Sequence, residues 1–144
     1  MISRREWAWL SAAGLVVLLA ANLPYALAYA APAGRVFGGV LFALQDGLSY
    51  LAKMRAGWRG EWLFTLPYTA EPGPGAFIFT YYLFLGHLAR WTGLGVEAVY
   101  HLARLAGGAL FLLAAYRLIA RFTPDITRRR LTWGLFSLGS GLGW

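Results

Sequence analysis

Residues 7–30, WAWLSAAGLVVLLAANLPYALAYA, decide the fold class of this chain. They lie within residues 7–34, a run of 28 residues without Asp, Glu, Lys or Arg. Because about 20 apolar residues suffice to cross the hydrocarbon core of a bilayer, we expect 7–30 to form a membrane-spanning helix. A cleaved signal peptide is the alternative, since Arg4 and Arg5 precede the run. The apolar core of a signal peptide is only about 7–15 residues long, so we favour an uncleaved anchor.

The overall composition also indicates a membrane protein. Of the 144 residues, 59% are hydrophobic and 13% are charged, whereas charged residues make up about 25% of an average globular chain. So few charges exclude a disordered chain, a coiled coil and an ordinary cytosolic enzyme. Seven Trp and eight Tyr suit a membrane–water interface. The net charge of +7 could indicate nucleic acid, but in so apolar a chain we expect basic loops that contact membrane lipid and no nucleic-acid partner.

Three further apolar stretches follow the first. Residues 76–95 and 98–120 are each predicted to span the membrane, and residues 131–144 to begin a fourth span. Fourteen residues are too few for a complete span, so the pattern predicts the N-terminal part of a longer membrane protein, or a small open reading frame derived from one. The predicted fold is all-α, a single region of polytopic transmembrane helices over residues 1–144, located in the cytoplasmic membrane.

The basic residues leave the predicted topology in conflict. Arg4 and Arg5 favour a cytoplasmic N-terminus, which places residues 31–75 in an outer loop. Three spans would then put Arg128–Arg130 outside, against the preference of basic loops for the cytoplasm. Either residues 76–89 do not cross completely, or this cluster lies outside. Because the first helix usually dominates orientation, we retain the cytoplasmic N-terminus.

The outer loop contains a predicted amphipathic helix within residues 35–58, RVFGGVLFALQDGLSYLAKMRAGW. At 100° per residue, one face groups a carboxylate, two hydroxyls and an ammonium, from Asp46, Ser49, Tyr50 and Lys53. The opposite face is apolar and is expected to lie on the membrane; it comprises Val40, Leu44, Leu48 and Leu51. Because Gly47 disfavours a helix interior, we expect the helix to begin near it, with Asp46 as its N-cap.

Asp46 is the candidate catalytic residue. The chain has only two Asp and four Glu, and a carboxylate held at a membrane surface beside basic residues can act as a general base on an acceptor hydroxyl. Lys53, Arg55 and Arg59 could neutralise a phosphate leaving group. The alternative is structural: Asp46 caps the helix or pairs with Lys53 in solvent.

For several of the remaining ionisable residues we expect either a structural or a functional role. Glu71 is expected to stabilise the N-terminus of the following helix, or to be a second acid at the site of Asp46. Glu6 and Glu97 are expected at the membrane interface, and Asp125 is expected to form a turn. Four residues near helix ends are expected to anchor at the interface or to bind a lipid phosphate: His87, Arg90, His101 and Arg104. No cofactor is certain from the sequence. A divalent metal ion is possible, but two His residues alone are a weak indication of a metal site.

The order of these features is informative as a whole. A basic N-terminus and an anchor helix precede a long outer loop, which contains Gln45-Asp46-Gly47-Leu48-Ser49-Tyr50. The entry to the second predicted span is Glu71-Pro72-Gly73-Pro74, and that span contains Tyr81-Tyr82-Leu83-Phe84-Leu85-Gly86. Arg104 lies shortly into the third predicted span. This arrangement resembles the start of a GT-C-type integral membrane glycosyltransferase, of the bacterial protein-mannosyltransferase-like group. The family often has His-Pro-Pro or Lys-Pro-Pro where this chain has Glu71-Pro72-Gly73-Pro74.

The resemblance implies transfer of a sugar from a polyprenyl-phosphate donor to an acceptor hydroxyl on the outer face of the membrane. It implies that Asp46 is the base toward the acceptor. The candidate substrate-binding residues are Ser49, Tyr50, Lys53, Arg55, Arg59, Glu71 and Arg104.

Two other functions remain open from the residues alone. A transporter should carry ionisable residues at mid-membrane depth or in broken helices, whereas here they gather at segment ends and in the outer loop. A small integral membrane protein without catalysis would not need the polar face around Asp46.

Overall fold

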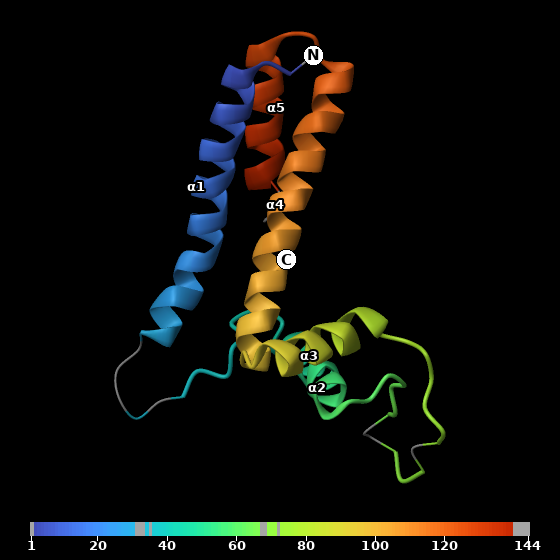
Figure 1. The fold of residues 1–144 in the computed structure, drawn as a ribbon. Coiled ribbons are helices and arrows are strands. Elements are labelled where there is room, and N and C mark those ends of the chain that lie inside the picture. The colour runs from blue at the N-terminus through green and yellow to red at the C-terminus, as the bar shows by residue number, and fades with distance from the viewer. Residues whose placement is uncertain (1, 31–33, 35, 67–68, 72, 140–144) are drawn as a thin grey trace. The chain divides into compact units, whose positions relative to one another are not determined.

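The protein is described from a computed structural model, which describes residues 2–30, 34, 36–66, 69–71 and 73–139. Over these residues the chain forms five α-helices and no strand (Figure 1). In chain order they are α1 (Arg4–Tyr29), α2 (Leu44–Arg59), α3 (Thr80–Thr92), α4 (Val96–Phe122) and α5 (Ile126–Leu138). The all-α prediction is therefore confirmed.

Two of these helices, α1 and α4, are long and apolar enough to cross a membrane. They contain 26 and 27 residues, which at about 1.5 Å per residue gives roughly 40 Å each. The hydrocarbon core of a bilayer is about 30 Å thick. These helices correspond to the first and third predicted spans, 7–30 and 98–120.

The structure does not confirm a span over residues 76–95. Only Thr80–Thr92 is helical, and its 13 residues extend about 20 Å, short of the roughly 30 Å that a span requires. The helix ends where Gly93 adopts a left-handed conformation with φ 72°. A fourth span over 131–144 is likewise not confirmed, because α5 has 13 described residues and residues 140–144 lie outside the described part of the chain.

The chain divides into two compact units. Unit 1 consists of Met1–Ala26 and Leu105–Trp144, and unit 2 of Leu27–Arg104. In unit 1, α1, the later part of α4 and α5 pack around Leu10, Leu112, Tyr116 and Trp133. The Trp133 indole nitrogen donates a 2.9 Å hydrogen bond to the Leu112 carbonyl, and the Trp133 ring meets Trp9 edge-on at 5.5 Å.

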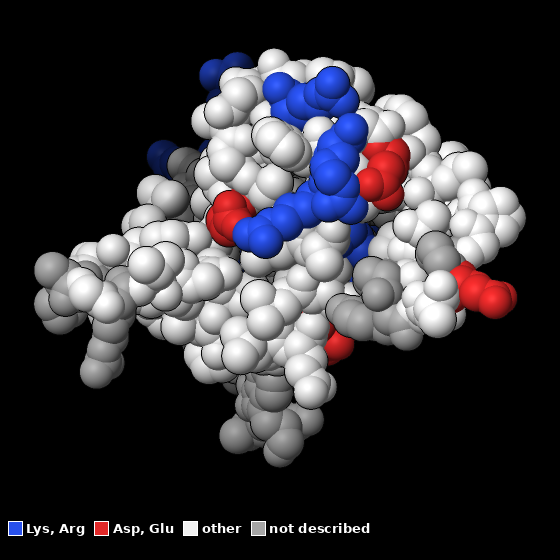
Figure 2. All heavy atoms as spheres, turned by 90° about the horizontal axis from the view of Figure 1, so that it is seen from below, with Lys and Arg blue, Asp and Glu red and all other residues white. Residues whose placement is uncertain are grey.

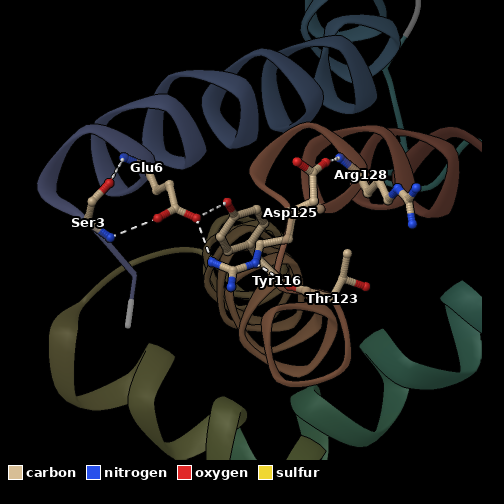
Figure 3. A network of polar contacts seen from close by, with 7 residues as sticks. Ser3, Glu6, Tyr116, Thr123, Asp125 and Arg128 are labelled. Atoms are coloured by element: carbon tan, nitrogen blue, oxygen red, sulfur yellow. Dashed lines mark hydrogen bonds and ion pairs between the residues drawn. The ribbon is translucent and has the colours of Figure 1, made fainter.

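A buried ion pair joins the three helices of unit 1 (Figure 3). Ser3 and Glu6 form a capping box at the start of α1: the Glu6 amide donates to Ser3 Oγ, and the Ser3 amide donates to Glu6 Oε2. Glu6 Oε1 accepts hydrogen bonds from the Tyr116 hydroxyl at 3.0 Å and from Arg129 Nη1 at 2.9 Å. The Glu6 and Arg129 side chains are only 5% and 10% exposed. The position of Glu6 at the membrane interface stays a prediction, but its carboxylate is buried as the partner of Arg129, a contact that the sequence did not predict.

This network places both basic clusters at one end of unit 1. Arg4 and Arg5 belong to the same first turn of α1 as Glu6, and Arg129 belongs to the first turn of α5. Asp125 caps α5, its side chain accepting a 2.8 Å hydrogen bond from the Arg128 amide. If α1 and α4 are the two crossings, Arg4, Arg5 and Arg128–Arg130 share one side of the membrane, and the topology conflict disappears.

Unit 2 is built on the contact between α2 and α3. Its core includes Leu51, Met54, Leu85 and Ala89, together with residues from the preceding loop and the start of α4. The two helices approach so closely that a Cβ added at Gly57 would overlap the Leu83 carbonyl, and one added at Gly86 would overlap the Met54 carbonyl. Two glycines therefore permit backbone contact between the helices.

The start of α2 differs from the prediction. Its N-cap is Ala43, with φ 47° and no side-chain hydrogen bond, and Asp46 lies inside the first turn. Gly47 is tolerated in the helix because its missing side chain makes room for Val40. The apolar face also divides: Val40 and Leu51 are buried in the core of unit 2, whereas Leu44 and Leu48 remain exposed. Only part of the predicted membrane-facing surface is therefore available to a membrane.

Candidate anion-binding site

Lys53, on α2, is a buried cation. It is 8% exposed, and its Nζ donates a 2.6 Å hydrogen bond to Ser49 Oγ one turn earlier. Among the residues that the structure describes, no carboxylate forms an ion pair with Lys53. Burial of an ammonium group is costly unless a counter-charge accompanies it, so this side chain is poised to meet an anion.

Three aromatic rings surround the Lys53 ammonium. Its Nζ lies 4.2 Å from the Phe79 ring centroid, 5.3 Å from that of Tyr50 and 5.9 Å from that of Phe64. The negative faces of aromatic rings attract a cation. The rings therefore stabilise the ammonium without neutralising it.

The backbone positions two of these rings from outside α2. Residues 64 and 76 form an antiparallel bridge with two 2.9 Å hydrogen bonds, which brings the Phe64 segment beside the segment that leads to Phe79. Phe79 is the N-cap of α3 and has φ 55°, a left-handed conformation that bulky residues rarely adopt. Strain of this kind persists only where the surroundings enforce it, and here it holds the ring against the ammonium.

A cavity of about 630 Å³ adjoins Lys53, within the range of about 300–1,000 Å³ for small-molecule sites. Its charged lining consists of three cations and one carboxylate: Lys53, Arg55, Arg59 and Glu61. Ser49, Phe64, Leu66 and Phe79 supply hydroxyl and apolar lining. On the face drawn in Figure 2, Lys and Arg side chains gather in one band with acidic side chains at its edges. The cavity therefore suits an anion with an apolar neighbour.

The two exposed arginines of the cavity are held by half-buried acids. Arg55 pairs with Glu97 at 3.0 Å and Arg59 with Glu61 at 2.9 Å, and the arginine side chains are 63% and 59% exposed. Ion pairs in such solvent-accessible positions contribute little, so a phosphate could displace them. Glu97 was expected only to anchor at the membrane interface. Its ion pair with Arg55 of α2 was not predicted from the sequence.

Tyr50 and Tyr82 stack beside this site, with ring centroids 4.5 Å apart and nearly parallel planes. Burial, followed by the neighbouring Tyr50, raises the pKa of Tyr82 to about 12. A phenol with this pKa keeps its proton at neutral pH. Tyr82 can therefore donate a hydrogen bond but cannot act as a general base.

The structure gathers some of the predicted site residues and separates others. Ser49, Lys53, Arg55 and Arg59 line the cavity, and Tyr50 contacts Lys53. Asp46, Glu71 and Arg104 are absent from the cavity lining.

Asp46 is exposed and lies one turn before Ser49 on α2. No described residue forms a hydrogen bond or an ion pair with its side chain. Neither the predicted cap nor the predicted pairing with Lys53 is present. Glu71 is also exposed, and its amide donates to Thr69 Oγ1. Arg104 contacts the His101 ring at 3.2 Å on α4.

Sequence reasoning missed His87 as an element of this region. It was expected at the membrane interface, but it is only 4% exposed. Its ring stacks on Trp62 at 3.9 Å, and its Nε2 lies 3.2 Å from the Glu61 carbonyl oxygen. His87 thus fixes the backbone beside Glu61, the partner of Arg59. The apolar residues around His87 in the sequence gave the only signal of burial.

The described residues show no group of three or more His, Cys, Asp or Glu side chains that could hold a metal ion. The chain matches no protein-family model, no curated protein and no solved structure.

Proposed function

We propose that this chain is the N-terminal membrane portion of a GT-C-type glycosyltransferase, and that the cavity at Lys53 binds the phosphate of a polyprenyl-phosphate-linked sugar. The observation that carries this proposal is the buried Lys53 ammonium, which pairs with no carboxylate among the described residues and lines a cavity with Arg55 and Arg59. Charge-assisted hydrogen bonds from such groups are well suited to phosphate. The aromatic rings and Leu66 would contact the first part of the prenyl chain.

Asp46 is the proposed general base. The acceptor hydroxyl oxygen would attack the anomeric carbon of the sugar while its proton passes to the Asp46 carboxylate. The bond between that carbon and the phosphate oxygen would break, and its electron pair would remain on the phosphate. Lys53, Arg55 and Arg59 would stabilise the added negative charge. The position of Asp46, exposed and one turn before Ser49, leaves its carboxylate available to an acceptor.

We further propose that α1 and α4 both cross the membrane and that unit 2 lies on the outer side. The shared end of α1 and α5 in unit 1 supports this topology, because Arg4, Arg5 and Arg128–Arg130 then satisfy the preference of basic segments for the cytoplasm. Localisation in the cytoplasmic membrane, with more than one crossing, is part of the same proposal.

The binding proposal can be tested with farnesyl phosphate, a short prenyl phosphate, and the purified chain in detergent. Calorimetric titration should show saturable binding of farnesyl phosphate and much weaker binding of the uncharged alcohol farnesol. Lys53→Gln should raise Kd about 10- to 100-fold, since a hydrogen bond to a charged group contributes about 1.5–3 kcal/mol. Arg121→Gln, at an exposed position near the end of α4, is the matched control and should leave Kd unchanged.

Equal binding of farnesyl phosphate and farnesol would show that the cavity does not recognise phosphate. Unchanged affinity of Lys53→Gln would place the phosphate elsewhere. Absence of binding to the folded chain would favour the alternative function, a small integral membrane protein without catalysis.

A further inference from the structure

Unit 2 exposes a cluster of large apolar side chains beside the Lys53 cavity. We propose that these side chains form an apolar lip that inserts into the interfacial layer of the membrane. The lip consists of Trp62, Leu63, Leu66, Phe77, Ile78 and Phe79. Its insertion rests on the proposal that α1 and α4 cross the membrane, but it does not require the cavity to bind phosphate.

The two halves of the lip are brought together by the backbone. The bridge between Phe64 and Ala76 pairs the segment 62–66 with the segment 76–79. All six lip residues are 44–72% exposed, and Phe77 is the most exposed of them. Large apolar side chains exposed together on two paired segments are unusual on soluble proteins and mark an interaction site.

The sequence around the lip matches a lipid partner. Residues 62–70 and 72–89 contain no Asp, Glu, Lys or Arg, so Glu71 is the one formal charge between Glu61 and Arg90. Trp and Phe rings are well suited to the boundary between headgroups and acyl chains. A protein interface would be expected to pair charges at its rim, whereas this segment offers almost none.

The position of the lip in the chain favours a membrane over a soluble partner. Unit 2 contains the last turn of α1 and the first turns of α4, and within it the Tyr29 ring contacts the His101 ring at 5.8 Å. If both helices cross the membrane, unit 2 begins and ends at the bilayer surface. Exposed apolar residues of unit 2 are then held within reach of the lipid.

The lip and the cavity share residues. Leu66 and Phe79 belong to the lip and also line the cavity. Insertion of the lip would bring this side of the cavity to the depth of the lipid headgroup phosphates. Arg55 and Arg59, also in the lining, are long cationic side chains that can reach such phosphates.

Because the chain has no Cys, single cysteines can report the position of the lip. The full chain with Phe77→Cys, labelled with a bimane fluorophore, is reconstituted into vesicles of phosphatidylcholine and phosphatidylglycerol. Spin-labelled lipids with shallow nitroxides should quench this fluorophore strongly, and aqueous iodide should quench it weakly. Gln45→Cys, at an exposed polar position on α2, is the control and should show the opposite pattern.

Strong quenching of the Phe77 label by iodide would overturn insertion of the lip. Protection from iodide without quenching by the spin-labelled lipids would also overturn it, because the lip would then be covered by protein. Extraction of the vesicles with alkaline carbonate separates this failure from that of the crossing proposal. A retained chain with a water-exposed label contradicts only the lip, whereas a released chain contradicts the crossings.

Discussion

At the scale of single residues, burial distinguishes the polar side chains of the candidate site from one another. Helical spacing correctly placed Ser49, Tyr50 and Lys53 near one another, because residues three and four apart share a helix face. The same reasoning could not find Phe64 and Phe79, since their contact with Lys53 depends on a backbone bridge and on the start of α3. Nor could it show that Lys53 is buried while Asp46 is exposed.

Ser49→Ala should destabilise the chain because it removes the hydroxyl that accepts the hydrogen bond from Lys53. A buried polar group left without its partner costs about 1–3 kcal/mol, so thermal unfolding in detergent should occur at a lower temperature. Ser11→Ala is the control, since Ser11 is exposed. Equal melting temperatures for the two variants would show that the contact between Ser49 and Lys53 contributes nothing.

Glu6→Gln tests the buried ion pair of unit 1. Glutamine can replace glutamate in a capping box, so the substitution removes the charge while preserving the start of α1. It leaves Arg129 buried without a counter-ion, which is expected to cost about 3–5 kcal/mol in the free energy of unfolding. Glu97→Gln, which breaks the exposed pair with Arg55, should cost less than about 1 kcal/mol. Similar losses for the two variants would contradict the burial of the Glu6 pair.

At the scale of helices, hydropathy predicted the long elements and overestimated a short one. The runs at 7–30 and 98–120 both became helices long enough to cross a membrane. Residues 76–89 are just as apolar, but their helix begins only at Thr80 and stops before Gly93. Its apolar side chains serve partly to cover α2 and partly to form exposed surface. Apolarity alone does not distinguish a helix that packs on its neighbour from one that spans a membrane.

Gly57→Ala and Gly86→Ala should each disrupt the contact between α2 and α3. The added methyl group would meet a backbone carbonyl of the other helix, and overpacking typically costs 1–3 kcal/mol, here with little room for relief. Nothing in the spacing of the 18 glycines of the chain singles out these two. A thermal unfolding series in detergent measures the effect.

Gly107→Ala is the matched control for that series. Gly107 lies inside α4, and beyond its neighbours and the backbone of its own helix no atom lies within 4 Å of a Cβ added there. Alanine is a better helix former than glycine by about 1 kcal/mol, so this variant should be neutral or stabilised. Stable variants at Gly57 and Gly86 would mean that the two helices are not in backbone contact.

At the scale of the whole molecule, the number of crossings decides on which side of the membrane the segment after α4 lies. With crossings at α1 and α4 alone, a cysteine at Thr92 should react with a membrane-impermeant maleimide in intact cells. A cysteine at Thr127 should react only after permeabilisation. Both positions are exposed in the structure. Labelling of Thr127→Cys in intact cells would instead indicate the three crossings predicted from hydropathy.

The central claim is that the Lys53 cavity binds a lipid-linked phosphate. It can be tested through the NMR resonance of a single carbon atom, Lys53 Cε. Lys53 is the single lysine of the chain, so biosynthetic labelling with ¹³Cε-lysine gives one lysine resonance in the NMR spectrum of the detergent-solubilised protein. Titration with farnesyl phosphate should shift this resonance in a saturable manner, and farnesol should not. A resonance that stays in place while the folded protein is saturated with farnesyl phosphate would contradict the claim.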